Sequence, residues 1–217
     1  MNAYQQAVIT VTASLPHQPY EYGGYGCPAD ITWHGKRLMK ASPGAFCCGI
    51  GSFIVFEALK LAGLEHRLTF AQAEELRRYA FVLGWEDKPE RLRGLAGGMI
   101  DIGIADEIAW EDAALGDGIH CQWDRGPSPT SGHTLIATGG AATGGAVYEL
   151  ADGSRGLWAV SANTSRPKLD PPFARGAAWV ETHGRKAGTQ FDYFKKTKAG
   201  KDRHFNIARF KPEFLEA

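Results

Sequence analysis

Residues 47–62 form a mainly apolar run that begins at two adjacent cysteines, Cys47 and Cys48, and this run constrains the fold more than any other segment. A proline and a glycine interrupt the chain at 43–44 and Gly63 follows the run, so the pattern predicts a helix with two thiols in its first turn. A cysteine there lies at the positive end of the helix dipole, which favours thiolate over thiol. Because the thiolate is the nucleophile, the position suits covalent catalysis where a base lies within reach.

The order of the periodic patterns predicts helices in the first half of the chain and strands in the second. Helices are expected at residues 4–14, 47–62, 69–80 and about 90–96, with Thr69 as an N-cap. Strands are expected at residues 118–123, 133–138, 146–150, 156–161, 177–182 and 204–210. This order indicates the α+β class, with N-terminal helices packed on an antiparallel sheet. The sequence has no internal repeat, and residues 1–217 are expected to be one domain.

The segments between these elements are expected to be irregular. Residues 15–43 are broken by prolines and glycines, and residues 105–114 form an acidic link. The glycine clusters at 94–98 and 139–145 are expected to be turns, because neither follows a strand and opens a helix as a phosphate-binding loop does. The basic run 195–203 is expected to be a solvated loop between strands.

The charge balance and the apolar runs exclude some classes of partner. Lysine and arginine number 24, aspartate and glutamate also number 24, and this zero net charge argues against a nucleic-acid partner. No apolar stretch approaches the ~20 residues that a membrane span needs. Residues 1–6 lack the basic start and apolar core of a secretory signal. A cytoplasmic location and secretion after processing both stay open, as does the oligomeric state.

The cysteine spacing argues against a metal site. None of the four cysteines belongs to a CxxC motif, so we expect no zinc site and no other metal or cofactor. The adjacent Cys47 and Cys48 are poorly placed for a disulfide with each other. Cys27 and Cys121 are expected to be structural.

A nucleophilic cysteine needs an imidazole within hydrogen-bond reach and a polar group that orients the ring. Of the seven histidines, His133 is the best candidate, because it opens an apolar strand directly after the small residue Gly132. A helix packed on a sheet brings its N-terminus to one strand end, so we expect Cys47 and His133 to meet. Ser161 and Asn163 end a later strand, and either is a candidate to orient the ring.

Four short motifs follow one another in a characteristic order. They are Tyr-Glu-Tyr-Gly-Gly at residues 20–24, Phe-Cys-Cys-Gly-Ile at 46–50, Leu-Gly-Asp at 115–117 and Ser-Gly-His-Thr-Leu-Ile at 131–136. This order resembles the NlpC/P60 family of papain-like cysteine peptidases. That family has an aromatic residue before Gly-Gly, an Asp-Cys-Ser-Gly-Leu helix start, a Pro-Gly-Asp strand start and Gly-His-Val-Gly-Ile on the next strand. The resemblance covers roughly residues 16–165.

The resemblance implies a papain-like NlpC/P60-type core and a role for several residues. Cys47 matches the nucleophile and His133 the general base. Tyr20 matches the tyrosine that borders the family's active site. Cys48 matches the serine after the nucleophile, so it is expected beside the substrate while it packs toward the core.

The chain departs from the family pattern near both catalytic residues. Phe46 stands where the family has an acidic residue, and the spacing from residue 24 to Cys47 and from Cys47 to His133 is longer than usual. The family's third polar residue is commonly a histidine, whereas this region offers Ser161 and Asn163. The extra length indicates an insertion around residues 25–45 and a C-terminal strand extension.

The expected function is that of a cysteine hydrolase that cleaves an amide or peptide bond through an acyl-enzyme. By resemblance, the substrate is peptide material of the peptidoglycan type. One alternative is an amidase or acyltransferase that acts on a small molecule or a protein side chain, with Trp33, His34 and Met39 of the insertion forming a roof over the pocket. Another alternative is a non-catalytic binding module on the same scaffold, which Phe46 and the missing third histidine motivate.

Overall fold

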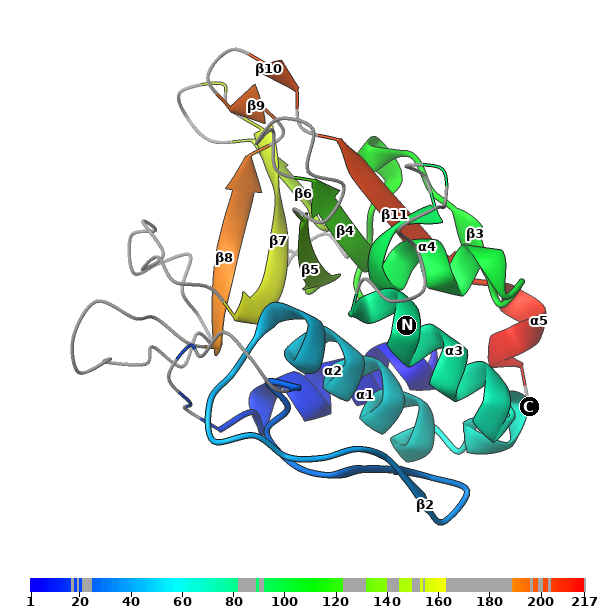
Figure 1. Cartoon of the computed structure of the whole chain (residues 1–217). Helices are drawn as coiled ribbons and strands as arrows, with labels where there is room; N and C mark the ends of the chain where they lie inside the picture. The colour runs from blue at the N-terminus through cyan, green and yellow to red at the C-terminus, as the bar shows by residue number, and fades with distance from the viewer. Residues whose placement is uncertain are drawn as a thin grey trace.

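Helices from the first half of the chain lie against an antiparallel sheet that is built mainly from its second half (Figure 1). The α+β class predicted from the sequence is therefore confirmed. This computed structural model describes residues 1–16, 18, 20, 25–81, 89, 92–122, 132–139, 145–149, 153, 155–162, 189–195, 197–198, 201–202 and 204–216. Among these residues, no helix has both the length and the apolar character that crossing a membrane requires.

Three predicted helices form within one residue of their expected ends. They are α1 (Ala3–Ala13), α2 (Cys47–Leu61) and α3 (Phe70–Ala80). Thr69 caps α3 as expected, because its hydroxyl oxygen accepts from the Gln72 N–H while the Gln72 side chain accepts from the Thr69 N–H. The sequence did not indicate three short helical segments, namely η1 (Glu65–Arg67), η3 (Trp110–Asp112) and α5 (Pro212–Leu215).

The glycine cluster at 94–98, expected to be a turn, is instead the start of helix α4 (Gly94–Asp101). Close packing explains why these positions lack side chains. A Cβ on Gly98 would lie 2.6 Å from the Tyr79 Cβ of α3, so the glycine lets the two helices approach each other. The helix expected at 90–96 is thus displaced toward the C-terminus, and residues 90–91 lie outside the described residues.

The main sheet has seven strands among the described residues, in the order β3-β11-β4-β5-β7-β6, with β8 on β7, and every pairing is antiparallel. The last strand of the chain, β11, inserts between β3 and β4, so the C-terminal extension belongs to the sheet (Figure 1). The strand bounds are β3 Ala105–Glu107, β4 Gly118–Gln122, β5 Gly132–Ala137, β6 Val147–Glu149, β7 Arg155–Ala162, β8 Thr189–Lys195 and β11 Phe205–Phe210.

Several segments expected to be irregular contain strands. The acidic link contains β3, and residues 15–43 contain a hairpin of β1 (Ile31–Trp33) and β2 (Lys36–Met39). The basic run contains a second small hairpin, β9 (Thr197–Lys198) with β10 (Lys201–Asp202). Each of these strands is four residues long or shorter, too short for apolar alternation to reveal it. The sequence also did not indicate β8, and the strand expected at 177–182 lies outside the described residues.

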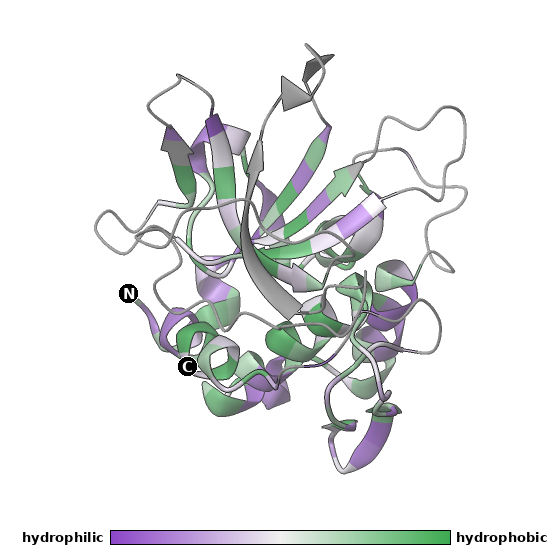
Figure 2. Ribbon diagram, turned by 90° about the vertical axis from the view of Figure 1, so that its left-hand side faces the viewer, coloured by the Kyte–Doolittle hydropathy of each residue, from purple (hydrophilic) through white to green (hydrophobic). Residues whose placement is uncertain are grey.

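Each face of the sheet carries a cluster of buried apolar residues, and hydrophobic residues occur along both the helices and the strands of the sheet (Figure 2). Ile136 and Val160 belong to the cluster shared with α1 and α2, whereas Leu135 and Leu157 belong to the cluster on the other face. Neighbouring residues of β5 therefore enter different clusters, as the two-residue period of a strand requires. Helix α2 is buried along most of its length because it packs between the sheet and α1.

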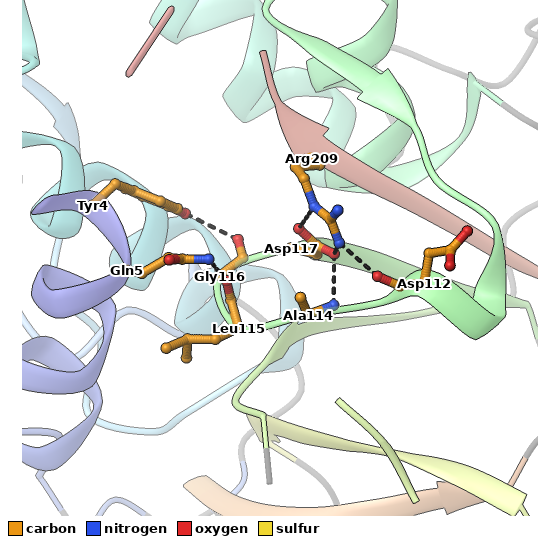
Figure 3. A network of polar contacts seen from close by, with 8 residues as sticks. All are labelled: Tyr4, Gln5, Asp112, Ala114, Leu115, Gly116, Asp117 and Arg209. Atoms are coloured by element: carbon orange, nitrogen blue, oxygen red, sulfur yellow. Dashed lines mark hydrogen bonds and ion pairs between the residues drawn. The ribbon is translucent and has the colours of Figure 1, made fainter. Parts of the chain in front are cut away.

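A polar network ties the start of β4 to β11 and to the N-terminal helix (Figure 3). The buried Asp117 carboxylate accepts from Arg209 Nε at 3.0 Å and Nη2 at 2.8 Å, and it also accepts from the Ala114 N–H at 2.8 Å. Burial raises the pKa of Asp117, although Arg209 and the Ala114 amide oppose this shift. Tyr4 donates to the Gly116 carbonyl. A cleft of about 250 Å³ lies beside this network, between α1 and the C-terminal residues.

Because Asp117 is almost fully buried, removal of its cation would leave an uncompensated carboxylate inside the protein. Because the Arg209 side chain is itself 40% exposed, we expect Arg209→Met to lower the free energy of unfolding by about 2 kcal/mol. Urea denaturation followed by circular dichroism would measure this change, with the neighbouring Lys211→Met as the matched control. Equal free energies of unfolding for Arg209→Met and Lys211→Met would contradict the proposed contribution of the Asp117–Arg209 pair to stability.

Candidate active site

Helix α2 begins at Cys47 because the preceding residue is extended and closely held. Phe46 is the N-cap, with φ −135° and ψ 148°, and its side chain makes no capping hydrogen bond. Its N–H donates to the carbonyl of Gly26, and Gly26 adopts φ +61°, which favours glycine. A Cβ on Gly49 would collide with the backbone at residues 25–26. The chain at residues 25–26 therefore fixes where the first turn of α2 starts.

A second glycine contact brings this helix end to the sheet. A Cβ on Gly51 would lie 2.5 Å from the Thr134 methyl carbon on β5. Any side chain at position 51 would therefore push α2 away from the strand that carries His133. This packing brings the N-terminus of α2 to the strand end that carries His133, as expected from the sequence.

Strands β5 and β7 pair at Ile136 with Val160 and at Ala137 with Ala159. Beyond these pairs, toward the α2 N-terminus, a side chain joins the two strands. The Ser161 hydroxyl donates to the Thr134 carbonyl at 2.6 Å, and Ser161 Oγ also lies 3.0 Å from His133 Nε2. Ser161 is fully buried and His133 is 5% exposed, so water does not replace these bonds. Ser161 is thus the polar residue that holds the His133 ring.

The hydrogen bonds of Ser161 assign the protons of the imidazole. The hydroxyl has one hydrogen, and the short bond to the Thr134 carbonyl takes it. Ser161 Oγ therefore accepts from His133, which places a hydrogen on Nε2 and leaves the lone pair on Nδ1. Nδ1 is then the ring nitrogen available to take a proton from a thiol.

Cys47 is the thiol in contact with this ring. The Cys48 thiol lies 3.8 Å from Cys47 Sγ and, by hydrogen bonding, lowers the pKa of Cys47 well below its usual value. The charge and hydrogen bond of His133 and the backbone N–H of Thr134 also lower this pKa, while burial opposes the shift. The arrangement stabilises a thiolate on Cys47 in an environment where only 3% of the residue is exposed.

The other thiols behave differently. Hydrogen bonding to Cys47 and burial raise the pKa of Cys48 well above its usual value, so its proton is retained. Burial raises the pKa of Cys27 to about 12, and its Sγ donates to the Ala29 carbonyl. Cys121 is fully buried in the cluster on the far face of the sheet. None of the four cysteines forms a disulfide bond, and the structural role expected for Cys27 and Cys121 fits their burial.

Of the remaining candidates, Tyr20 lies near the site and Trp33 does not. Tyr20 pairs with Ala45 in a parallel bridge, and its ring meets the Phe46 ring edge-on at 5.8 Å. Trp33 was expected to roof the pocket, but it is fully buried, donates from Nε1 to the Leu68 carbonyl and packs on Phe56, more than two helical turns from Cys47. Trp33 is therefore part of the core, because the β1–β2 hairpin packs along α2 rather than over its N-terminus.

The other expected roof residues do not cover the thiols either. Met39 is 1% exposed within the core, and His34 contacts the Leu68 carbonyl beside Trp33. Asn163, the other candidate to orient the imidazole, lies outside the described residues.

A buried histidine that the sequence did not indicate lies on β4, beside the strand that carries His133. His120 on β4 is 3% exposed, and a Cβ on either Gly94 or Gly132 would collide with its ring. The small residue before His133 is thus required by the close approach of the His120 imidazole. Burial, together with the nearby His133, His204 and Arg93, lowers the pKa of His120 to about 3, so the ring stays neutral. The glycines at 94 and 132 were the only sequence signal for it.

Within the described part of the chain, no group of three or more histidine, cysteine, aspartate or glutamate residues is arranged to hold a metal ion. Comparisons of the chain with protein-family models, with curated proteins and with solved structures found no match.

If Ser161 orients the ring, removing its hydroxyl should slow the reaction of Cys47 with iodoacetamide. The lost bond stabilises an imidazolium, so we expect Ser161→Ala to reduce the alkylation rate at pH 6 about tenfold. Mass spectrometry of the Cys47 peptide would measure the rate. Ser52→Ala is the matched control, because Ser52 is equally buried and its hydroxyl has no hydrogen-bond partner among the residues that the structure describes. An unchanged alkylation rate in Ser161→Ala would show that Ser161 does not orient the His133 ring for the reaction of Cys47.

Proposed function

We propose that the protein is a cysteine hydrolase with a papain-like core of the NlpC/P60 type, which cleaves an amide bond through a covalent acyl-enzyme. The observation that carries the proposal is the set Cys47, His133 and Ser161, in which a thiol at a helix N-terminus contacts an imidazole that a buried hydroxyl orients. Nucleophile, base and orienting group are the three parts that this chemistry needs. The order of sequence motifs adds independent support for the family.

The first step follows from the hydrogen-bond directions. The proton of Cys47 Sγ moves to His133 Nδ1, while the hydrogen on His133 Nε2 stays there and remains donated to Ser161 Oγ. The resulting thiolate attacks the carbonyl carbon of the substrate. His133 then gives the proton to the departing amine, and a thioester to Cys47 remains. Water, deprotonated by the same imidazole, releases the acid product and the free thiol.

The tetrahedral intermediate needs donors for its oxyanion, and the first turn of α2 supplies them. The Phe46 side chain makes no capping hydrogen bond to this turn, so it does not compete for the N–H groups of Cys47 and Cys48. These groups lie next to the reacting sulfur and at the positive end of the helix dipole. They are therefore suited to stabilise developing negative charge.

The family resemblance supports the proposed class of substrate, and the burial of Cys47 supports its proposed size. The family resemblance favours a peptide or isopeptide bond in peptidoglycan-like material. Cys47 is only 3% exposed, however, and a slender substrate reaches such a thiol more readily than a thick polymer does. This observation favours the second candidate, an amidase or acyltransferase that acts on a small molecule or a protein side chain. The non-catalytic alternative requires an ordinary thiol with His133 out of reach, and the contacts of Cys47 count against it.

The nucleophile assignment can be tested by labelling below neutral pH. Because the pKa of Cys47 is lowered, its thiolate persists below the pKa of about 8.5 that is usual for a free thiol. We expect fast iodoacetamide labelling of the wild type at pH 6 and its loss in Cys47→Ala. Cys121→Ala, which removes a fully buried thiol, should keep the fast phase. Fast labelling that survives in Cys47→Ala would overturn the assignment.

The two substrate classes can be separated with purified peptidoglycan. We expect digestion by the wild type to release new muropeptides, detected by mass spectrometry, and Cys47→Ala to release none. A wild type that is labelled rapidly at Cys47 but releases no muropeptides would favour the amidase or acyltransferase. A panel of small acyl amides and acylated peptides would then be tested with the same pair of proteins.

A further inference from the structure

Two thiols occupy the first turn of α2, and the helix dipole acts on both of them. A dipole alone therefore does not decide which sulfur carries the negative charge. The contacts of the two side chains do differ, and they form a directed series from β5 to the nucleophile.

The series begins at the Thr134 side chain. Its hydroxyl donates to Cys48 Sγ at 3.8 Å, and Cys48 Sγ lies 3.8 Å from Cys47 Sγ. Because the Cys48 sulfur accepts from Thr134, its own hydrogen is free to point at Cys47. Thr134 is 1% exposed and Cys47 is 3% exposed, so the two ends of the series are shielded from water, while Cys48 between them is half-buried.

We propose that Cys48 is a positioning residue for the nucleophile: its S–H donates to Cys47 Sγ, and the Thr134 hydroxyl fixes that direction. This inference rests on the proposed function, because it concerns the thiolate that the hydrolase would use. The opposite pKa shifts of the two cysteines agree with a proton held on Cys48 and charge held on Cys47. Cys48 is thus more than a packing residue, although it lies against the core.

Substitutions at positions 48 and 134 can distinguish the effect of the hydrogen-bond donor from the effect of side-chain volume. A serine at position 48 keeps a hydroxyl donor of similar size, whereas alanine removes the donor. At position 134, serine keeps the upstream hydroxyl and valine replaces it with a methyl group of the same shape. Cys48→Ala with Cys48→Ser, and Thr134→Val with Thr134→Ser, are therefore two matched pairs.

The experiment follows the ultraviolet absorbance of the thiolate against pH, together with the pH dependence of alkylation at the Cys47 peptide. We expect the Cys47 midpoint to rise by about one pH unit in Cys48→Ala, because a hydrogen bond to a charged group is lost. Below the midpoint, this shift corresponds to about tenfold less thiolate. Cys48→Ser and Thr134→Ser should keep the wild-type midpoint, and Thr134→Val should raise it by a smaller amount.

Circular dichroism and thermal unfolding would establish that each variant is folded. If Cys48→Ala does not fold, the Thr134 pair decides the question by itself. Wild-type midpoints in both Cys48→Ala and Thr134→Val would overturn the inference, and so would a wild type in which Cys48 is alkylated first at low pH. Wild-type midpoints in Cys48→Ala and Thr134→Val would leave the hydrolase proposal standing as long as Cys47 keeps its fast labelling. An ordinary thiol midpoint for wild-type Cys47 would instead overturn both.

Discussion

Helix α2 approaches β5 so closely that a Cβ on Gly51 would lie 2.5 Å from the Thr134 methyl group, and the candidate active site depends on this contact. A helix and a sheet normally stand farther apart, with side chains filling the gap between them. Here the missing side chain at position 51 lets the first turn of α2 reach the end of β5. His133 immediately precedes Thr134 on that strand, so the contact that seats the helix also sets the approach of Cys47 to the imidazole.

At the same end of the sheet, β5 and β7 no longer pair with each other, and side chains bond to the backbone of β5 instead. The Thr134 carbonyl and N–H are bonded to Ser161 Oγ and to Cys47 rather than to β7, which pairs with β5 at Ile136 and Ala137. Buried backbone groups left without partners would be costly, so these side chains satisfy the strand at the point where β5 and β7 part. One hydroxyl therefore does two things: it completes the hydrogen bonds of β5 and fixes the proton on His133 Nε2.

Local patterns predicted α2, α3 and the central strands, because each is long enough for its apolar period to be visible. The glycines of α4 were misread as a turn because their role lies in tertiary contacts with Tyr79 and His120, which no local pattern contains. Cys47 and His133 could be paired from the sequence, since a helix start and a strand start carry them. Ser161 could not be separated from Asn163, because that choice depends on where β7 ceases to pair with β5. Trp33 was misplaced for a similar reason, since an aromatic residue in an insertion can cover a pocket or fill a core equally well.

The helix and the sheet make different contributions to which of the two thiols carries the negative charge. The N-terminus of α2 supplies a positive potential that any thiolate in the first turn would use, so it raises the acidity of Cys47 and Cys48 without distinguishing them. The sheet makes the distinction, because β5 offers an imidazole and an N–H to Cys47 but a hydroxyl donor to Cys48. A sulfur that accepts from a neutral hydroxyl and keeps its own hydrogen becomes a donor, and the sulfur beside a base becomes the anion. In the proposed hydrolase, the strand that faces the helix therefore determines which cysteine is the nucleophile, and a shift of that strand would change this choice even if the helix stayed intact.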